Sequence, residues 1–304
     1  MSSRRSDRPL TQFAMQDFLS RTKPPPDGSE QMGERRLAQP GQPGKRTLTR
    51  NPETHRKIMR GPVKDLVLGE ASQSGGALGD TFIIRRESPW ETFKKIYECE
   101  LAGRFDVAIP HVRPERLVAI RTIRAENIDR MLHLYQRIQH PNILCPQECF
   151  LHEGSAFALH DDIPISLDHI IACEAYLDEV ELATILVQIL DGLLYLTDQR
   201  IEHRRLSSSN VLVTGRGEVK IAGLHECVEL QADHTPRYSK PLEVITMELM
   251  QKYEKEDNRI GVDDVERWPC DSYAIGFLSS IETEASVREL REKLVSLELS
   301  NKAY

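Results

Sequence analysis

The stretch HRRLSSSNVLVTGRGEVKIAGL, residues 203–224, decides the fold. It contains two short apolar runs, NVLVTG (210–215) and EVKIAG (218–223), separated by a Gly-Arg-Gly turn. Short apolar runs on either side of a glycine-containing turn are typical of a β-hairpin. Immediately upstream, DEVELATILVQILDGLLYLTDQ (178–199) repeats apolar residues at helical spacing. The sequence therefore predicts a long amphipathic helix followed by a hairpin.

The segment upstream of this helix is dominated by short β-type runs. These are FKKIYEC (93–99), FDVAIPH (105–111), RLVAIRTI (116–123) and SAFALHD (155–161). One helical run, ENIDRMLHLYQRIQ (126–139), interrupts them. After the hairpin the patterns are again helical, in LEVITMELMQKY, PCDSYAIGFLSS and ASVRELREKLVSLEL. The pattern predicts a β-rich part followed by a helical part.

Several of these blocks, in this order, resemble the protein kinase family. VAIR (118–121) is similar to the VAIK strand of that family, HRRLSSSN (203–210) to its HRDLxxxN catalytic loop, and VKIAGL (219–224) to the strand before DFG. Two further blocks agree in register, HPNI (140–143) after the small-lobe helix and ITMELM (245–250) in the central large-lobe helix. The resemblance covers about residues 91–298.

The resemblance implies an α+β, bilobal, protein-kinase-like fold. The β-rich small lobe is expected at about 91–160 and the α-helical large lobe at about 161–298, after a transition segment at 61–90. The activation segment is expected to be short. An alternative alignment places the central helix at DSYAIGF (271–277), with PLE (241–243) standing for the APE motif of the family. We prefer ITMELM, because it matches better and leaves the expected helices after it.

Positions that bind the nucleotide in kinases are substituted. Aligned on Val107, the three loop glycines fall on Glu100, Ala102 and Phe105. A carboxylate there repels phosphate, and side chains prevent close approach of the backbone. The lysine position is Arg121, whose planar guanidinium does not replace a compact ammonium. The hinge that would face a nucleotide is expected at Leu159, His160, Asp161 and Asp162.

Positions that carry the chemistry are substituted as well. The helix glutamate falls on Met131, and the base falls on Arg205, which cannot accept a hydroxyl proton. Asn210 is retained, but the DFG aspartate falls on Gly223, and one neutral ligand makes a poor magnesium site. The aspartate that opens the central helix falls on Tyr238. Two remnants of the catalytic loop are kept, His203 and Arg204.

These losses favour a catalytically inactive pseudokinase that acts as a protein-interaction or scaffold module. No active catalytic residue, metal or cofactor is expected, although weak or metal-independent nucleotide binding stays open. Arg205 is expected to pair with a carboxylate or to bind an anion. Two alternatives remain: a residual or unconventional ATP-dependent serine/threonine kinase, and a nucleotide-sensing switch in which Arg121 and Arg205 replace the metal charge.

Charge and composition separate the N-terminus from the rest. The chain has a net charge of −7, yet residues 1–60 carry 13 Lys and Arg against 6 Asp and Glu. Segments such as TKPPPDGSE (22–30) indicate a disordered basic arm. The acidic remainder of the chain is expected to bind nucleic acid poorly, because such binding needs a cationic face. The sequence contains no run of 18 apolar residues, so we expect no contact with a membrane. Six cysteines without a CxxC pair favour reduced thiols and an intracellular, cytoplasmic or nuclear, location.

One motif stands out within the arm. In LTQFAMQDFL (10–19), Gln12, Met15, Phe18 and Leu19 resemble the short motif by which nuclear proteins dock on the sliding clamp of DNA replication. Leu19 departs from it, because the motif ends in two aromatics. A generic partner-binding helix and a segment without function are the alternatives. The expected partners are thus an unknown protein for the chain and a sliding-clamp-type partner for the arm.

Overall fold

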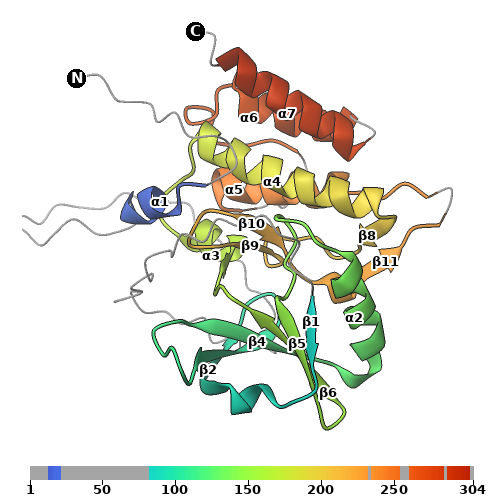
Figure 1. The fold of residues 1–304 in the computed structure, drawn as a ribbon. Coiled ribbons are helices and arrows are strands. Elements are labelled where there is room, and N and C mark those ends of the chain that lie inside the picture. Colours follow the sequence, from blue (N-terminus) through green and yellow to red (C-terminus); the bar gives the residue numbers. More distant parts are fainter. Residues whose placement is uncertain (1–12, 22–81, 232–233, 254–259, 284–285, 302–304) are drawn as a thin grey trace, which may run out of the picture. The chain divides into compact units, whose positions relative to one another are not determined.

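The computed structural model describes residues 13–21, 82–231, 234–253, 260–283 and 286–301. Most of the arm and transition segment expected at 1–90 therefore lies outside the described residues. The rest forms two lobes, one rich in strands and one in helices, as the sequence predicts (Figure 1).

The small lobe is built on one six-stranded sheet. Its strands are β1 (Ile83–Arg85), β2 (Phe93–Glu100), β3 (Arg104–Pro110), β4 (Val118–Ile123), β5 (Glu148–His152) and β6 (Ser155–His160). They lie in the order β1-β5-β6-β4-β3-β2, and the β1–β5 pair is parallel whereas the other pairs are antiparallel. Two 3-10 turns complete the chain here, η1 (Pro89–Glu91) and η2 (Ala125–Asn127).

Helix α2 (Ile128–Arg137) packs against this sheet and the large lobe. Its apolar residues recur at helical spacing, so one face is buried through Met131, Leu134 and Tyr135. The helix ends before Ile138, which is itself buried and adopts an extended conformation. The helix predicted within residues 126–139 is therefore confirmed.

The large lobe combines helices with two small sheets. The helices are α3 (Leu167–Ala172), α4 (Glu179–Asp198), α5 (Ser239–Gln251), α6 (Tyr273–Thr283) and α7 (Val287–Asn301). The sheets contain β7 (Ile165–Ser166), β9 (Val211–Val213) and β10 (Val219–Ile221), and β8 (Ile201–His203) with β11 (Cys227–Glu229). A 3-10 turn, η3 (Leu224–Glu226), precedes β11. The predicted hairpin is confirmed, because Val219 pairs with Val213 across β9 and β10.

Helix α4 begins at a capping box. The Asp178 carboxylate accepts the Glu181 amide hydrogen at 2.8 Å, and the Glu181 carboxylate accepts that of Asp178 at 2.9 Å. By length and hydropathy alone α4 could cross a membrane, but 61% of that window is buried within the fold. Burial on this scale is what a core helix of a folded domain requires, so the resemblance to a membrane span carries little weight.

Helix α5, which carries ITMELM, is buried in the large lobe. Within ITMELM, four apolar side chains are fully buried, namely Ile245, Met247, Leu249 and Met250. The Trp268 indole donates a hydrogen bond to the Met250 carbonyl at 3.0 Å and is itself buried. A helix that is apolar on nearly every side lies in the middle of a lobe. Helix α6 (Tyr273–Thr283), which carries the alternative DSYAIGF, also buries Phe277, Leu278 and Ile281, so the choice between the two alignments stays a prediction.

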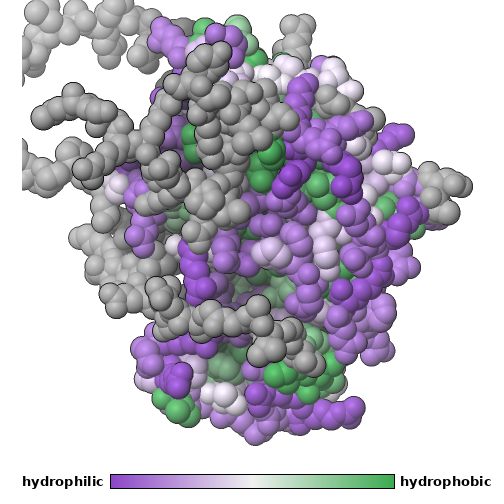
Figure 2. All heavy atoms as spheres, turned by 45° about the horizontal axis from the view of Figure 1, so that its top comes forward, coloured by the Kyte–Doolittle hydropathy of each residue, from purple (hydrophilic) through white to green (hydrophobic). Residues whose placement is uncertain are grey.

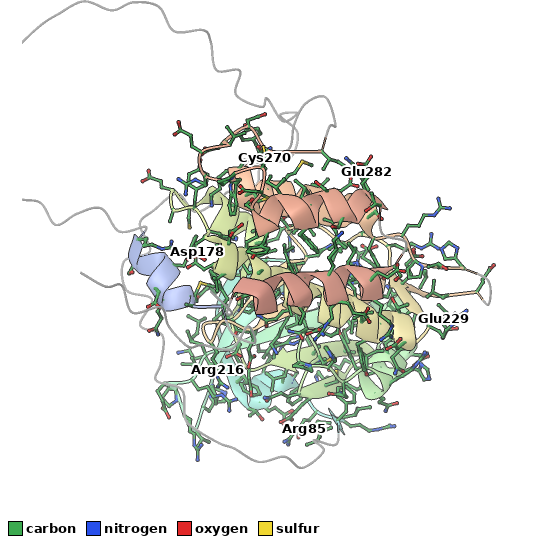
Figure 3. The ribbon with its side chains drawn as sticks, turned by 90° about the horizontal axis from the view of Figure 1, so that it is seen from above. Arg85, Asp178, Arg216, Glu229, Cys270 and Glu282 are labelled. Atoms are coloured by element: carbon green, nitrogen blue, oxygen red, sulfur yellow. The ribbon has the colours of Figure 1, made fainter. Side chains whose placement is uncertain are left out.

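The described residues on one face of the molecule are mainly polar (Figure 2). Hydrophilic residues predominate on the face shown in Figure 2, and apolar ones form separate patches. Figure 3 shows charged side chains such as Arg85, Asp178 and Glu229 near the rim of the molecule in that view. No large apolar face is evident among the described residues in these views.

Candidate functional site

Arg121 lies on β4 and points at the turn between β2 and β3. Its guanidinium donates hydrogen bonds to three consecutive carbonyls, to Leu101 at 2.8 Å, Ala102 at 2.9 Å and Gly103 at 3.2 Å. Burial lowers the pKa of Arg121 to about 10, so it remains charged at neutral pH. The cation is therefore already engaged by the backbone of its own chain.

The turn between β2 and β3 is tight. Ala102 and Gly103 both adopt positive φ, 47° and 96°, and Glu100 pairs directly with Arg104. The Leu101 amide donates to the Gly103 carbonyl at 3.0 Å, which closes the turn. Positive φ at two of the three loop residues suits a short hairpin connection, and the three loop carbonyls face Arg121.

An apolar cluster lies beneath this turn. Phe105, Val107 and Ala119 are buried together, and Leu101 and Ile163 pack against them. The Arg121 guanidinium lies 4.9 Å from the centre of the Phe105 ring, within cation–π range. Phe105 occupies the third loop-glycine position identified in the sequence. The bulky side chain thus fills space that a glycine would leave open.

Met131 on α2 is part of the main core and offers no charge to β4. The helix is attached in another way. Arg130 donates to the His225 carbonyl at 3.2 Å and also to the carbonyl of Cys227. Arg137 adds an ion pair to β11 at 3.4 Å. Two arginines that reach the segment after Gly223 therefore anchor the small-lobe helix.

His203 holds the catalytic loop together. Its backbone N–H donates to the Tyr238 hydroxyl at 2.9 Å, and its ring Nε2 lies 2.8 Å from the Ala222 carbonyl. The Arg205 amide donates to Nδ1 at 3.3 Å. This set of partners requires a neutral ring that carries its proton on Nε2, and burial lowers the pKa of His203 accordingly. The histidine therefore serves as a structural tie.

The two arginines of the loop point outward. The Arg205 side chain is 73% exposed and lies 3.4 Å from the Glu226 carboxylate. Arg204 pairs with Glu202 at 2.6 Å and is also exposed. Of the two roles expected for Arg205, the structure shows the pairing with a carboxylate.

Asn210 and Gly223 also have structural roles. The side-chain amide of Asn210 donates a hydrogen bond to the Arg205 backbone carbonyl at 2.6 Å. The backbone carbonyl of Asn210 accepts a hydrogen bond from the Ala222 backbone amide at 2.8 Å. Gly223 has φ +88°, and a Cβ there would lie 3.2 Å from His203 Nε2. In the part of the chain that the structure describes, no group of three or more His, Cys, Asp or Glu converges as a metal site would.

The residues of the expected hinge bond to other residues of the small lobe. The Leu159 carbonyl accepts the Gln147 amide hydrogen at 2.9 Å, and the side chain of Leu159 is buried. Asp161 pairs with Arg116 and accepts a hydrogen bond from the Gln147 side chain. Asp162 is partly exposed. Leu159 and His160 are the last two residues of β6, and Asp161 and Asp162 follow the strand directly.

His160 is the unusual member of this group. It is only 4% exposed, and neither ring nitrogen has a hydrogen-bond partner among the described residues. Burial, with a smaller effect from the nearby Arg121, lowers its pKa to about 3. A neutral imidazole without partners in the interior costs stability.

The arm motif is placed against the large lobe. Residues 13–21 depart from the expected disordered arm, because Phe13, Met15 and Phe18 are buried in the main core and Met15–Arg21 forms helix α1. Leu19 lies in this helix, and Gln12 falls outside the described residues. Burial of the apolar side chains of residues 13–21 offsets the conformational entropy that this segment loses on ordering. The composition of the arm as a whole does not suggest such burial.

Several contacts at this site were missed by reasoning from sequence. The partners of Arg121 and the filling of the cluster by Leu101 and Ile163 depend on tertiary approach. A carboxylate partner was expected for Arg205, but the sequence does not single out Glu226. No local signal marks such pairs, because only the arginine of each pair lies in a recognisable motif and its partner does not.

Comparison with known proteins identifies the family. Residues 95–255, slightly more than half of the chain, match the protein kinase domain. The chain therefore belongs to the protein kinase domain family. It is 27% identical over 166 residues to the serine/threonine-protein kinase TAO1-B of Xenopus laevis, which covers 50% of this chain and 17% of that protein.

A second relative is the serine/threonine-protein kinase srb10 of Schizosaccharomyces pombe. It is 27% identical over 176 residues, which cover 51% of this chain and 46% of that protein. TAO1-A of Xenopus laevis is 32% identical over 98 residues, 32% of this chain and 10% of that protein. The matches thus span less than half the length of these relatives.

Proposed function

We propose that this protein kinase domain is a catalytically inactive pseudokinase that acts by binding other proteins. The observation that carries the proposal is the Arg121 guanidinium, bound to three carbonyls of the β2–β3 turn. In a working kinase this turn covers the ATP phosphates, and the residue at this position holds them. Here the cation and the turn satisfy each other, so nucleotide phosphate must compete with the folded protein itself.

The chain also lacks the general base and the magnesium-binding carboxylate that phosphoryl transfer requires. Arg205 has no lone pair with which to take a proton from a substrate hydroxyl, and it points into solvent beside Glu226. Gly223 offers no carboxylate for magnesium, and the Asn210 side chain donates to the Arg205 carbonyl. Loss of a general base alone lowers the rate by roughly 10²–10⁴-fold.

The segment that would hold a protein substrate is short. Fifteen residues separate Gly223 from Ser239, where α5 begins. Part of this segment is committed to β11, which pairs with β8 and accepts Arg130 from α2. These contacts support a rigid unit that presents surfaces to partners instead of a platform for turnover.

Thermal unfolding of the full chain with ATP or ADP, with and without Mg²⁺, tests the proposal. We expect no shift of the unfolding midpoint and no phosphate incorporation into the chain or generic substrates. A shift with nucleotide alone would replace the proposal with a nucleotide-sensing switch. Phosphate incorporation that disappears with Asn210→Ala would establish a kinase.

A further inference from the structure

Residues 13–21 contact the large lobe as a peptide ligand contacts a receptor. The Phe13 amide donates a hydrogen bond to the Gly217 carbonyl at 2.9 Å, in the turn between β9 and β10. Phe13, Met15 and Phe18 are 2%, 4% and 0% exposed. The two phenylalanine rings lie 5.6 Å apart. One backbone bond and three apolar anchors therefore fix the start of the segment.

Gly217 is shaped for this contact. It has φ +81°, and a Cβ built on it would lie 1.7 Å from the Phe13 carbonyl oxygen. No side chain fits at that distance, so the turn accepts the segment only because residue 217 is glycine. A close approach of backbone to backbone is a recurrent use of glycine.

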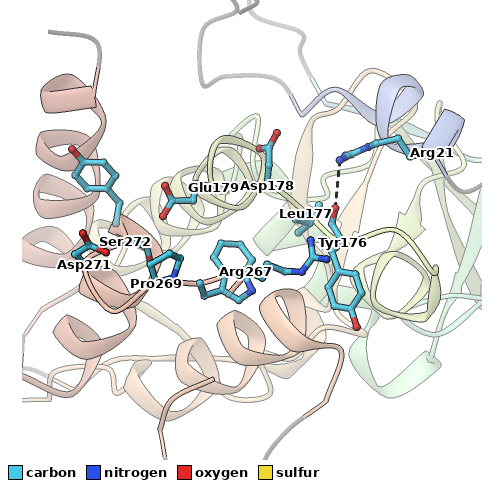
Figure 4. A pocket seen from close by; sticks show the side chains of 11 residues that line it. Arg21, Tyr176, Leu177, Asp178, Glu179, Arg267, Pro269, Asp271 and Ser272 are labelled. Carbon is cyan, nitrogen blue, oxygen red and sulfur yellow. Dashed lines mark hydrogen bonds between the residues drawn. The ribbon is translucent and has the colours of Figure 1, made fainter. Parts of the chain in front are cut away.

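Charged groups fix the other end of the segment. Arg21 pairs with Glu181 and donates to the Tyr176 carbonyl at 3.4 Å, beside a pocket of about 550 Å³ at the start of α4 (Figure 4). The Lys252 ammonium lies 5.9 Å from the Phe18 ring centre and 5.2 Å from that of Tyr176. These lobe residues, Gly217, Tyr176, Glu181 and Lys252, define the docking surface.

We propose that the docking surface is a peptide-recognition site that the chain's own residues 13–21 occupy. It takes a protein segment with the same Phe-x-Met-x-x-Phe anchors from another molecule once its own segment is withdrawn. Phe13 precedes α1, and Met15 and Phe18 lie one turn apart within it. Such apolar anchors, with a charged contact at one end, follow the usual recognition of a short helix by a protein surface. Because Met15 and Phe18 are the anchors of the arm motif, docking withholds that motif from other proteins.

The test uses the full chain and a fluorescent peptide of residues 10–22. Met15→Glu combined with Phe18→Glu disables the resident segment and leaves the docking surface intact. We expect this variant to bind the peptide, by fluorescence anisotropy, at least about 10-fold more tightly than the wild-type chain, whose tethered segment competes at high effective concentration. Equal affinity for the two chains, or no binding to the folded variant at millimolar peptide, would overturn the proposal.

A pair of glycine variants separates the surface from general strain. Added to the double variant, Gly217→Ala should weaken peptide binding at least about 10-fold, because its Cβ collides with the peptide backbone. Gly154→Ala is the matched control, since Gly154 also has positive φ, +75°, but no atom within 4 Å of its Cβ position. Equal losses in the two variants would assign the effect to strain and reject the site.

A measurement on the wild-type chain does not depend on any variant being folded. Excess unlabelled peptide should accelerate hydrogen exchange in residues 13–21, because it displaces the resident segment. Unchanged exchange at millimolar peptide, with the amides of Phe13 and Phe18 still protected, would refute exchange at this surface.

Discussion

Replacing Arg121 with methionine removes three hydrogen bonds from a partly buried cation and keeps an unbranched side chain. A hydrogen bond to a charged group contributes roughly 1.5–3 kcal/mol, so the three bonds together are worth several kcal/mol. Against this, burial lowers the Arg121 pKa from 12.5 to about 10, which corresponds to a cost of about 3 kcal/mol. We therefore expect Arg121→Met to lower the free energy of unfolding by about 2–4 kcal/mol.

Equilibrium urea unfolding, followed by circular dichroism, measures this loss. The midpoint of thermal unfolding should fall by roughly 2–4 °C for each kcal/mol in a domain of this size. Arg205→Met is the matched control, because that side chain is 73% exposed with one contact at 3.4 Å, and its effect should stay within about 0.5 kcal/mol. Equal effects for the two variants would refute the assignment of Arg121 as the residue that holds the turn.

Three further predictions concern the same region. Because burial lowers the His160 pKa from 6.5 to about 3, the unfolded chain binds a proton below pH 6.5 that the folded chain does not, so free energy of unfolding is progressively lost as the pH falls from 6.5 toward 3. His160→Leu should reduce the slope of the free energy of unfolding against pH by about 1.4 kcal/mol per pH unit between pH 6.5 and about 4, as measured by urea unfolding. The same slope in the wild-type chain and the variant would contradict the burial argument. Gly223→Ala should lower the free energy of unfolding by about 1–2 kcal/mol, because the φ of Gly223 is +88°. Gly276→Ala in α6 is the control and should be neutral or stabilising, because no atom lies within 4 Å of its Cβ position. Equal losses in the two variants would contradict the backbone argument. Arg205→Asp should not create Mg·ATP binding in isothermal titration, since Arg121 still occupies the turn, and a measurable isotherm would show that Arg205 blocks the site.

Much of the fold follows from local patterns in the sequence. The β9–β10 hairpin was predictable because a glycine turn separates two short apolar runs, and α5 because ITMELM is apolar on nearly every side. The substituted positions were also predictable, since Arg121, Arg205 and Gly223 each lie within a recognisable block. Blocks of this kind fix which residue stands where, and they depend on neighbours along the chain.

The contacts of those residues were not predictable. Arg121 is separated from its acceptor carbonyls by about twenty residues, and its direction depends on how β3 and β4 pair. The docking of Phe18 was hidden because its flanking sequence is polar and rich in proline and glycine, which argues for disorder when averaged over the arm. Only tertiary burial, absent from any local pattern, reveals that Phe13, Met15 and Phe18 form a compact set.

The position of α1 also has a topological consequence. The chain contacts the large lobe at α1, enters the small lobe at β1, and returns to the large lobe after β6, so two covalent connections join the lobes. Exchange of α1 between copies would join two molecules without any new interface, so protein concentration would decide whether the segment closes a ring within one molecule or links a pair.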